Sequence, residues 1–411
     1  MSGRSNMYDA LIVGGGPAGT SAAIHLAQGG ARVLLAEQKR FPRAKLCGEF
    51  ISPECLDHFA RLGVEEQMMR AGGAEIEETI FYSRSGSGVS VPSLWFGSGR
   101  RVALGLSRAE MDARLLGRAS AAGVEVREEA QAVGLLTDGA QVRGVRLKAG
   151  GRLIELSARV TIDATGRARA LARYLGKNEE KRRRAGKRPA PLVAFKAHLD
   201  HQDGAPGRCE IYFYPGGYGG LSQVENGLSN LCFIAPAAEV RACRGDAERV
   251  MRSLLSKNRR AAETLRRARV CSEWLAIALE GFGRREIMPA PGMLAVGDAA
   301  SFIDPFTGSG MLMALESGEL AAGAVARYLS KQGDGRSQAD AVSLLDGLAA
   351  DYRAVYEERF SARLRVCAMM RRAAFVPRLA ETLIFALNAS RGLRRGLARS
   401  TRGRKGGANG K

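Results

Sequence analysis

Three glycines near the N-terminus have the residue type and the spacing of a pyrophosphate-binding turn. Gly14, Gly16 and Gly19 directly follow the apolar residues 10–13, and Pro17 stands where a helix can begin. In such a turn the first glycine makes the tight bend, the second lets the backbone approach the pyrophosphate, and the third lets the helix pack closely on the strand. The N-terminus of that helix faces the anion.

An acidic residue completes this unit. Glu37 ends a second apolar run, residues 33–36, and lies 18 residues after Gly19. A carboxylate in this place accepts hydrogen bonds from ribose hydroxyls. Residues 8–37 therefore predict a strand, a helix and a second strand that together bind a dinucleotide. The alternative is a glycine-rich turn in another kind of α/β unit.

The loop after this unit carries a second group of side chains that could do chemistry. Cys47, Gly48 and Glu49 lie between Glu37 and a helix that is predicted to begin at Pro53. Loops in this place lie at the carboxyl edge of a parallel sheet, where ligands bind. We therefore expect Cys47 and Gly48 beside the bound dinucleotide.

The elements that must position these residues fall into two groups. In the first group, Ser107 and Glu110 form a capping box for a helix over residues 107–119. This group also has expected strands at 124–128, 141–147, 152–156, 159–162 and 292–296, and a long helix at 311–329. The second group has expected strands at 193–199, 209–214 and 230–234, a glycine-rich stretch at 215–220 and a basic helical region at 247–268.

This order of elements predicts an α/β fold with a discontinuous Rossmann-like domain, a second domain with a mixed β-sheet and a C-terminal helical segment. The expected nucleotide-binding domain comprises residues 1–75, 100–180 and 290–330, and the expected substrate domain comprises residues 76–99 and 185–289. Helices are expected over 331–395, followed by a basic, disordered tail at 396–411. The charge-dense residues 177–187 are expected to form a solvated crossing between the domains.

The composition limits the class of protein and its partners. The 411 residues carry 62 Lys and Arg against 42 Asp and Glu, a formal net charge of +20. This charge fits a compositional bias, an anionic membrane surface or an acidic substrate. Nucleic acid is disfavoured as a partner because the basic clusters lack interleaved aromatic residues. The C-terminal helices either cap the second domain or lie on an anionic membrane.

Cysteine spacing and hydropathy exclude other classes. The seven cysteines form no CxxC pair, which argues against a zinc site, an iron–sulfur cluster or a disulfide framework. We therefore expect no metal. The sequence shows no signal peptide and no apolar stretch of about 20 residues, so we expect a cytoplasmic protein, with attachment to the inner face of the membrane as an alternative. The sequence does not specify an oligomeric state.

Four separated segments resemble one family. They are GGGPAGTSAA with Glu37, SRAEMDARL from Ser107, IDATG from Ile162, and GDAASFIDPFTGSGMLMALESGELAA from Gly297. Together, in this order, they resemble the FAD-dependent oxidoreductases of the aromatic hydroxylase and geranylgeranyl reductase superfamily over residues 8 to about 330. The resemblance implies FAD as the bound dinucleotide and NAD(P)H as a transient reductant, since only one GxGxxG motif is present.

The resemblance also implies a role for each matching residue. Arg108, supported by Asp112, would reach the FAD phosphate or ribitol side, and Asp298 would hydrogen-bond the ribitol. The residues that would hold the pyrophosphate are Gly14, Gly16, Pro17, Ala18 and Gly19, with Glu37 on the adenosine ribose. The residues that would lie near the flavin are Gly308, Ser309, Gly310 and Met311, where a helix N-terminus stabilises negative charge on the reduced ring.

The segments KLCGEFISPE and ALESGELAA look like the reductase side of the superfamily. The substrate-pocket motif of those reductases, PxxYxWxFP, is matched only in part: Pro215 and Tyr218 fit, whereas Gly220, Ser222 and Gln223 replace the Trp, the Phe and the second Pro. Ser301 replaces a histidine that is common in the hydroxylases. The GWxWxIP motif of the flavin halogenases and their lysine are absent from the sequence.

The favoured reaction is therefore reduction of a C=C bond in a hydrophobic isoprenoid, lipid or polyketide-like substrate. The alternatives are O2-dependent hydroxylation of an aromatic or polyketide substrate, and electron transfer to a membrane quinone or a protein partner. Cys47, Tyr218 and Glu49 are the candidates to donate a proton to the atom that is reduced. The other interpretation makes Cys47 a small buried filler and Tyr218 a wall of the pocket.

Overall fold

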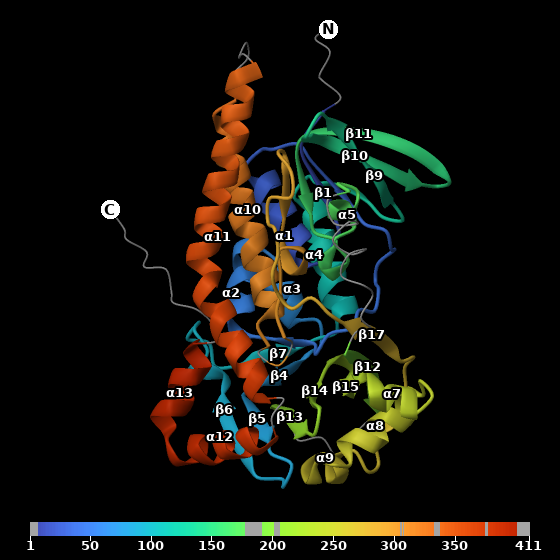
Figure 1. Cartoon of the computed structure of the whole chain (residues 1–411), viewed down its shortest axis with the longest axis vertical. Helices are drawn as coiled ribbons and strands as arrows, with labels where there is room; N and C mark the ends of the chain where they lie inside the picture. The colour runs from blue at the N-terminus through green and yellow to red at the C-terminus, as the bar shows by residue number, and fades with distance from the viewer. Residues whose placement is uncertain are drawn as a thin grey trace.

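The computed structural model describes residues 7–176, 191–200, 206–304, 306, 308–332, 338–374 and 377–400. The charge-dense segment 177–187 and residues 401–411 of the expected tail lie outside these ranges. Two sheets dominate the described residues, one in the upper and one in the lower half of Figure 1.

The first sheet has the strand order β8-β2-β1-β11-β10-β9, with β19 also paired to β11. Its strands are β1 (Tyr8–Val13), β2 (Val33–Ala36), β8 (Glu125–Arg127), β9 (Gln131–Asp138), β10 (Gln141–Ala149), β11 (Arg152–Asp163) and β19 (Met293–Ala295). The strands β8, β2, β1, β11 and β19 are parallel, which confirms the predicted Rossmann-like core. Two strands are expected within 152–162, but β11 is continuous because it leaves its hairpin with β10 and enters the parallel sheet.

Helix α1 (Pro17–Gln28) and helix α10 (Gly310–Ser330) pack against each other beside this sheet. Ser21 Oγ donates to the Leu315 carbonyl at 2.8 Å. A Cβ atom on Gly318 would lie 2.3 Å from the Ala18 carbonyl oxygen, so this crossing requires glycine. The close crossing fixes the N-termini of both helices relative to the sheet (Figure 1). The other helices around this sheet are α2 (Pro53–Leu62), α3 (Glu65–Met69), α4 (Arg108–Ala121), α5 (Ala170–Arg173) and α11 (Gln338–Ala374).

An acid-sensitive ion-pair cluster joins α2 to α10. His58 Nδ1 and Arg61 Nη2 each lie 3.0 Å from Glu319 Oε2. Burial alone would raise the pKa of Glu319, but hydrogen bonds from His58 and Arg61 outweigh it and lower the pKa to about 2. A lowered carboxyl pKa stabilises the fold above the ordinary value of 4.5, and that stability is lost as the pH falls toward about 2.

We therefore expect Glu319→Gln to reduce the dependence of the unfolding free energy on pH between about 4.5 and 2. Urea titrations across that range would measure it. Glu66→Gln is the matched control, because Glu66 pairs with Arg70 on the exposed surface at 2.5 Å. A Glu319→Gln curve parallel to that of the unsubstituted protein would contradict the assignment.

The second sheet has the order β16-β12-β15-β14-β13-β5-β6, with β17 paired to β12. Its strands are β5 (Glu78–Tyr82), β6 (Gly88–Pro92), β12 (Leu192–Asp200), β13 (Arg208–Tyr214), β14 (Gly217–Gln223), β15 (Leu228–Pro236), β16 (Arg269–Val270) and β17 (Leu275–Leu279). The remaining strands form two small sheets. One contains β3 (Phe50–Ile51), β7 (Ala103–Gly105) and β4 (Ala74–Ile76), and the other contains β18 (Gly283–Arg284) and β20 (Ser301–Phe302). No strand is expected in the glycine-rich stretch 215–220, but its residues 217–220 belong to β14 because they pair with β13.

The basic helical region expected at 247–268 is two helices, α8 (Ala247–Leu255) and α9 (Arg259–Thr264), next to α7 (Ala237–Ala242). Asn258 breaks the helix. Its Oδ1 accepts from the Ala261 amide, and its Nδ2 donates to the carbonyls of Tyr82, Ser83 and Phe213. The break therefore ties the helices to β5 and β13.

The C-terminal helices α12 (Pro377–Ala389) and α13 (Arg391–Ser400) pack on the edge strand β6. Asn388 Nδ2 donates to the Gly88 carbonyl at 3.1 Å, and Arg394 Nη1 donates to the Ser90 carbonyl at 3.3 Å. Residues 396–400, expected to be disordered, are helical in α13, where Ala398 is buried against Trp95 and Phe96. In the described part of the chain, no helix is long and apolar enough to cross a membrane.

Candidate active site

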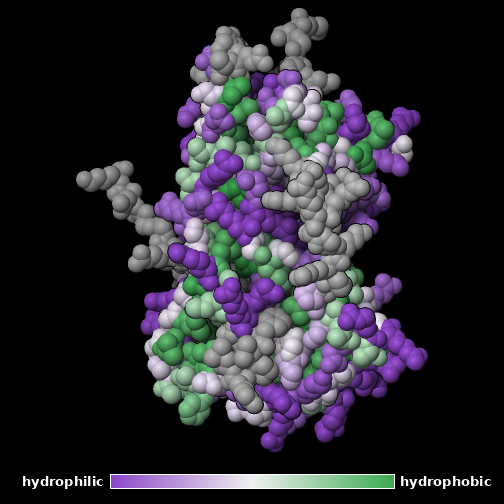
Figure 2. Space-filling view, viewed as in Figure 1, coloured by the Kyte–Doolittle hydropathy of each residue, from purple (hydrophilic) through white to green (hydrophobic). Residues whose placement is uncertain are grey.

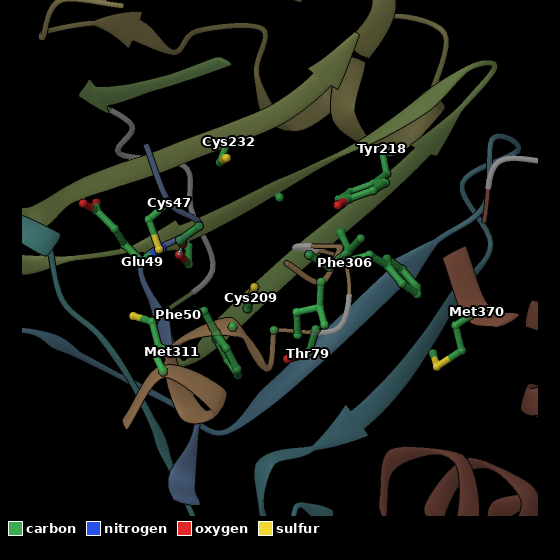
Figure 3. Close-up of a pocket in the computed structure, with 18 of the residues that line it drawn as sticks. Cys47, Glu49, Phe50, Thr79, Cys209, Tyr218, Cys232, Phe306, Met311 and Met370 are labelled. Atoms are coloured by element: carbon green, nitrogen blue, oxygen red, sulfur yellow. Dashed lines mark hydrogen bonds between the residues drawn. The ribbon is translucent and has the colours of Figure 1, made fainter. Parts of the chain in front are cut away.

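A cavity of about 620 Å³ brings the predicted site residues together with the second sheet (Figure 3). Its walls come from the β1–α1 turn, the loop before β3, the N-termini of α4 and α10, and the strands β5, β6, β13, β14 and β15. Ten of the predicted cofactor residues line it: Gly16, Pro17, Ala18, Cys47, Gly48, Arg108, Asp298, Gly308, Gly310 and Met311.

Gly14 and Gly19 lie behind the cavity wall, where the fold itself requires glycine. A Cβ atom on Gly14 would lie 2.3 Å from the Ala164 carbonyl oxygen, and Gly14 has φ +113°. A Cβ atom on Gly19 would lie 1.9 Å from the Gly14 carbonyl oxygen. Gly16 differs: its Cβ would meet only Arg108 Nη2 at 3.8 Å, with the cavity in front.

Glu37 is buried at the end of β2 and is not in the cavity wall. Its Oε2 accepts from the Gly15 amide, and its Oε1 accepts from the Lys39 amide, each at 2.9 Å. Arg43 Nη2 lies 3.5 Å from the same carboxylate. In this arrangement Glu37 fixes the glycine turn, and its contact with a ribose stays a prediction.

Arg108 lies at the start of α4 and faces the cavity beside Cys47. Its Nε and Nη2 donate to the two carboxylate oxygens of Asp112 at 2.9 and 2.6 Å, and both side chains are buried. Burial would lower the pKa of Arg108, but Asp112 and the adjacent Cys47 sulfur outweigh burial and raise it. Arg108 is therefore a fixed positive charge in the cavity wall.

Asp298 and Lys45 both line the cavity and interact electrostatically. Burial raises the pKa of Asp298, although the positive charges of Lys45, Arg167 and Arg108 oppose that shift. Lys45 is open to the cavity, and desolvation by the surrounding protein, with Arg108 adding to it, lowers its pKa. The sequence motifs predict no role for Lys45 or Arg167. The available signal is that Lys45 lies two residues before Cys47.

The N-terminus of α10 opens into the cavity opposite α1. Gly308, Gly310 and Met311 line the wall, and Ser309 is fully buried behind them. A Cβ atom on Gly310 would have no protein atom within 4 Å, so open space lies in front of the first helical amides. These amides and the helix dipole favour an anionic group at this point.

The loop that carries Cys47 is held by a buried ion-pair cluster. Glu49 is fully buried and has φ +53°, an unusual backbone conformation for a residue with a side chain. Its Oε1 accepts from Lys196 Nζ at 2.5 Å and from the Arg108 amide at 2.8 Å, and its Oε2 lies 2.7 Å from His198 Nε2. Burial raises the pKa of Glu49, but the His198 and Lys196 partners outweigh it and lower the pKa.

Tyr218 lies on the opposite side of the pocket from Cys47 (Figure 3). Its hydroxyl donates to Asp304 Oδ1, and Arg371 Nε lies 3.1 Å from Asp304 Oδ2. Burial and the neighbouring Asp304 carboxylate raise the pKa of Tyr218 well above its usual range. All three predicted proton donors line the cavity, but their surroundings differ. The Cys47 thiol accepts from a backbone amide, the Glu49 carboxylate is paired with Lys196 and His198, and the Tyr218 hydroxyl is buried against Asp304.

A family model described as the FAD binding domain matches residues 7–338. The chain belongs to the FAD-binding-domain family. The digeranylgeranylglycerophospholipid reductase of Methanosarcina mazei is 26% identical over 358 residues, which cover 86% of this chain and 80% of that protein.

Solved structures share the fold of this FAD-binding chain. A geranylgeranyl bacteriochlorophyll reductase-like protein from Thermoplasma acidophilum has a TM-score of 0.76 at 20% identity and covers 95% of each chain. A flavin-dependent brominase also has a TM-score of 0.76, at 21% identity, over 96% of this chain and 93% of its own. The fold alone therefore does not separate reduction from halogenation.

The residues of the cavity fit FAD. Gly16, Gly48 and Gly310 stand in the wall with open space in front of each, so the cavity can receive a ligand between the N-termini of α1 and α10. Both helix N-termini favour anionic groups, which FAD has at its pyrophosphate. The fixed cation Arg108 lines the same cavity, and its Nη2 would lie 3.8 Å from a Cβ atom on Gly16.

We expect Gly16→Val to fold and to bind FAD about 10- to 100-fold more weakly, because the new side chain would meet little protein and would occupy the cavity at the start of α1. The FAD content of the purified protein and a titration of the apoprotein would measure the loss. Gly117→Ala is the control: Gly117 lies on the exposed face of α4 with nothing within 4 Å. Normal FAD binding by Gly16→Val would contradict the site.

Proposed function

We propose that this FAD-dependent oxidoreductase uses NAD(P)H to reduce C=C bonds in a hydrophobic isoprenoid, lipid or polyketide-like substrate. The observation that carries this proposal is the position of the Cys47 thiol, where the charged part of the cavity meets an apolar part. The name of the methanosarcinal relative, a digeranylgeranylglycerophospholipid reductase, supports the choice of an isoprenoid chain.

The apolar part of the cavity suits a long hydrocarbon. It lies on the second sheet and under the C-terminal helices, and its residues include Phe81, Val89, Val91, Ile211, Phe213, Phe306, Met370, Ile384 and Leu387. Aliphatic and aromatic walls bind a hydrocarbon by removing its surface from water and impose little requirement for polar groups. Tyr218, one of the two residues that match the reductase motif, also lines the cavity.

Reduction of a C=C bond adds a hydride equivalent to one carbon and a proton to the other. FAD, when bound, would supply the two-electron chemistry, with NAD(P)H as the reductant. The protein must then supply the proton, and we assign it to Cys47 Sγ.

The surroundings of Cys47 favour proton donation. The Glu49 amide donates to Cys47 Sγ at 3.4 Å, and the Arg108 guanidinium lies beside the same sulfur. When the proton leaves Sγ for the substrate carbon, this amide and this cation stabilise the thiolate that remains. Solvent protonates the thiolate before the next turnover.

We assign Glu49 and Tyr218 to positioning. Glu49 is a poor proton donor because its lowered pKa keeps it ionised, and it instead fixes the loop that carries Cys47. Tyr218 keeps its proton because its pKa is raised, and its hydroxyl is directed at Asp304. Its ring contributes to the apolar wall through an edge contact with Phe306 at 5.4 Å between centroids.

An anaerobic redox cycle tests this function. We expect NADPH to bleach the visible absorbance of the FAD-loaded protein, and a polyprenyl substrate to restore it without O2. If the absorbance returned only when O2 was present with the substrate, and oxygen were found in the product, the result would favour the monooxygenase. Restoration by a quinone or by a carrier protein, with the polyprenyl substrate inert, would favour electron transfer.

A further inference from the structure

The last two helices keep an exposed apolar surface that their packing on β6 does not use. Leu383 is 40% exposed, Phe385 79% and Leu393 53%, and Met369 at the end of α11 is 63% exposed. Figure 2 shows hydrophobic residues gathered at its lower left, over the position of α12 and α13 in Figure 1. We call Met369, Leu383, Phe385 and Leu393 the apolar patch.

The apolar patch is continuous with the active-site cavity. Met369 and Leu383 are both exposed on the surface and part of the cavity wall. The neighbouring Ile384 and Leu387 line the cavity from the same helix. The cavity therefore reaches the surface through side chains of the patch, at the end lined by the second sheet.

Positive charge surrounds the patch. Residues 377–400 contain five arginines and one glutamate. Arg395 and Arg399 are exposed on α13, whereas Arg391 and Arg394 place their guanidinium groups 5.7 Å from the centre of the Trp95 ring. An apolar face bordered by arginines is the arrangement of a helix that lies in the interface of an anionic bilayer.

We propose that α12 and α13 dock on an anionic phospholipid bilayer, with the apolar patch among the lipid tails and the arginines at the head groups. This proposal rests on the proposed function and adds the route of the substrate: an isoprenoid chain enters sideways from the bilayer between Met369 and Leu383. The positive charge around the patch favours an anionic bilayer over a second copy of this chain. A second copy of this chain would bring like charges together, whereas anionic head groups neutralise them.

Vesicle flotation tests the docking. The FAD-loaded protein should bind vesicles that contain phosphatidylglycerol, bind phosphatidylcholine vesicles about tenfold or more weakly, and detach as salt rises. Leu383→Ser/Phe385→Ser and Arg395→Glu/Arg399→Glu should each weaken binding about tenfold or more. Leu153→Ser is the control, since Leu153 is 66% exposed on β11 in the other half of the molecule. Equal binding by all variants would overturn the proposal.

A tryptophan placed at the patch gives a local measurement. The emission of Phe385→Trp should be quenched by lipids brominated in their tails, and the emission of Leu153→Trp should not. The proposal would be overturned if the lipids quenched neither tryptophan and if analytical ultracentrifugation showed dimers that Phe385→Ser abolishes. Those results would assign the patch to a second copy of the chain.

Activity separates this proposal from the function on which it rests. The Phe385→Ser/Leu393→Ser variant, whose two positions lie on the exposed patch and outside the cavity wall, should reduce a short, water-soluble prenyl alcohol normally and should lose turnover of a long polyprenyl lipid in vesicles. Equal activity of this variant on the embedded lipid would refute entry from the bilayer while leaving the reductase function intact. Normal docking without reduction of either substrate would refute the function and leave the docking intact.

Discussion

Replacing Cys47 by alanine is expected to lower the rate of C=C reduction about 10²- to 10⁴-fold, the usual contribution of a positioned proton donor. FAD content and the bleaching of its absorbance by NADPH should remain normal, because the side chain removed is small and Arg108 keeps its bond to Asp112. Stopped-flow absorbance, read first with NADPH alone and then with substrate, would separate the two half-reactions. Cys47→Ser should recover part of the rate, since a hydroxyl can still donate.

Cys232→Ala is the matched control for this experiment. Cys232 lines the same cavity, and burial, with Cys47 adding to it, raises the pKa of its thiol to about 12. Burial keeps this thiol protonated although the positive charge of Lys196 opposes the shift, so its loss should change the rate little. Equal losses in the two variants would show that Cys47 acts only through packing.

Replacing Lys196 by methionine is expected to destabilise the FAD-loaded protein by about 3–5 kcal/mol, because it removes one partner of a buried ion pair. Lys196 and Glu49 are 3% and 0% exposed at their side chains, so the Glu49 carboxylate would lose a cation that water cannot replace. Urea unfolding followed by circular dichroism would measure the loss. The loop that carries Cys47 should also become less ordered, which would raise its rate of thiol labelling.

The double variant Lys196→Met/Glu49→Gln provides the internal check. Removing both charges should cost less than removing Lys196 alone, since no uncompensated charge stays buried. Arg70→Met is the surface control, because its pair with Glu66 is exposed and should contribute less than about 1 kcal/mol. A double variant that is less stable than the single variant would contradict the electrostatic explanation.

Much of the cofactor side could be predicted because its contacts are local or encoded in motifs. Gly14, Gly19 and Pro17 are determined by the geometry of one turn, and the parallel strands follow from short apolar runs. Separate motifs then brought Arg108 and Asp298 to the same cavity. For these residues, spacing along the chain carries the spatial information.

The cluster around Glu49 could not be predicted in this way. Lys196 lies 147 residues from Glu49, and His198 lies 149 residues away, so only the pairing of the two domains brings them together. The one local signal was a lysine within the apolar strand 192–200, which marks a buried charge in need of a partner. The sequence therefore did not reveal that Lys196 and His198 contact the Glu49 carboxylate.

On the substrate side, the contacts of Tyr218 also could not be predicted from spacing along the chain. Its partner Asp304 belongs to the stretch after the GD motif, and Arg371 reaches that carboxylate from α11. The glycine-rich residues 215–220 gave no strand pattern, yet Gly217 and Gly219 lie in β14, where added Cβ atoms would lie 2.3 Å from the Ile234 carbonyl oxygen and 2.9 Å from Leu255. These positions need glycine because the neighbouring strand and helix pack closely on β14, and the sequence pattern does not show this.

The most direct test is the mass of the product after anaerobic turnover. The FAD-loaded protein, NADPH and a polyprenyl lipid should give a product that has gained two hydrogens for each double bond reduced, with Cys47→Ala giving almost none. A substrate that stays unchanged without O2 and gains an oxygen atom in air would contradict the account.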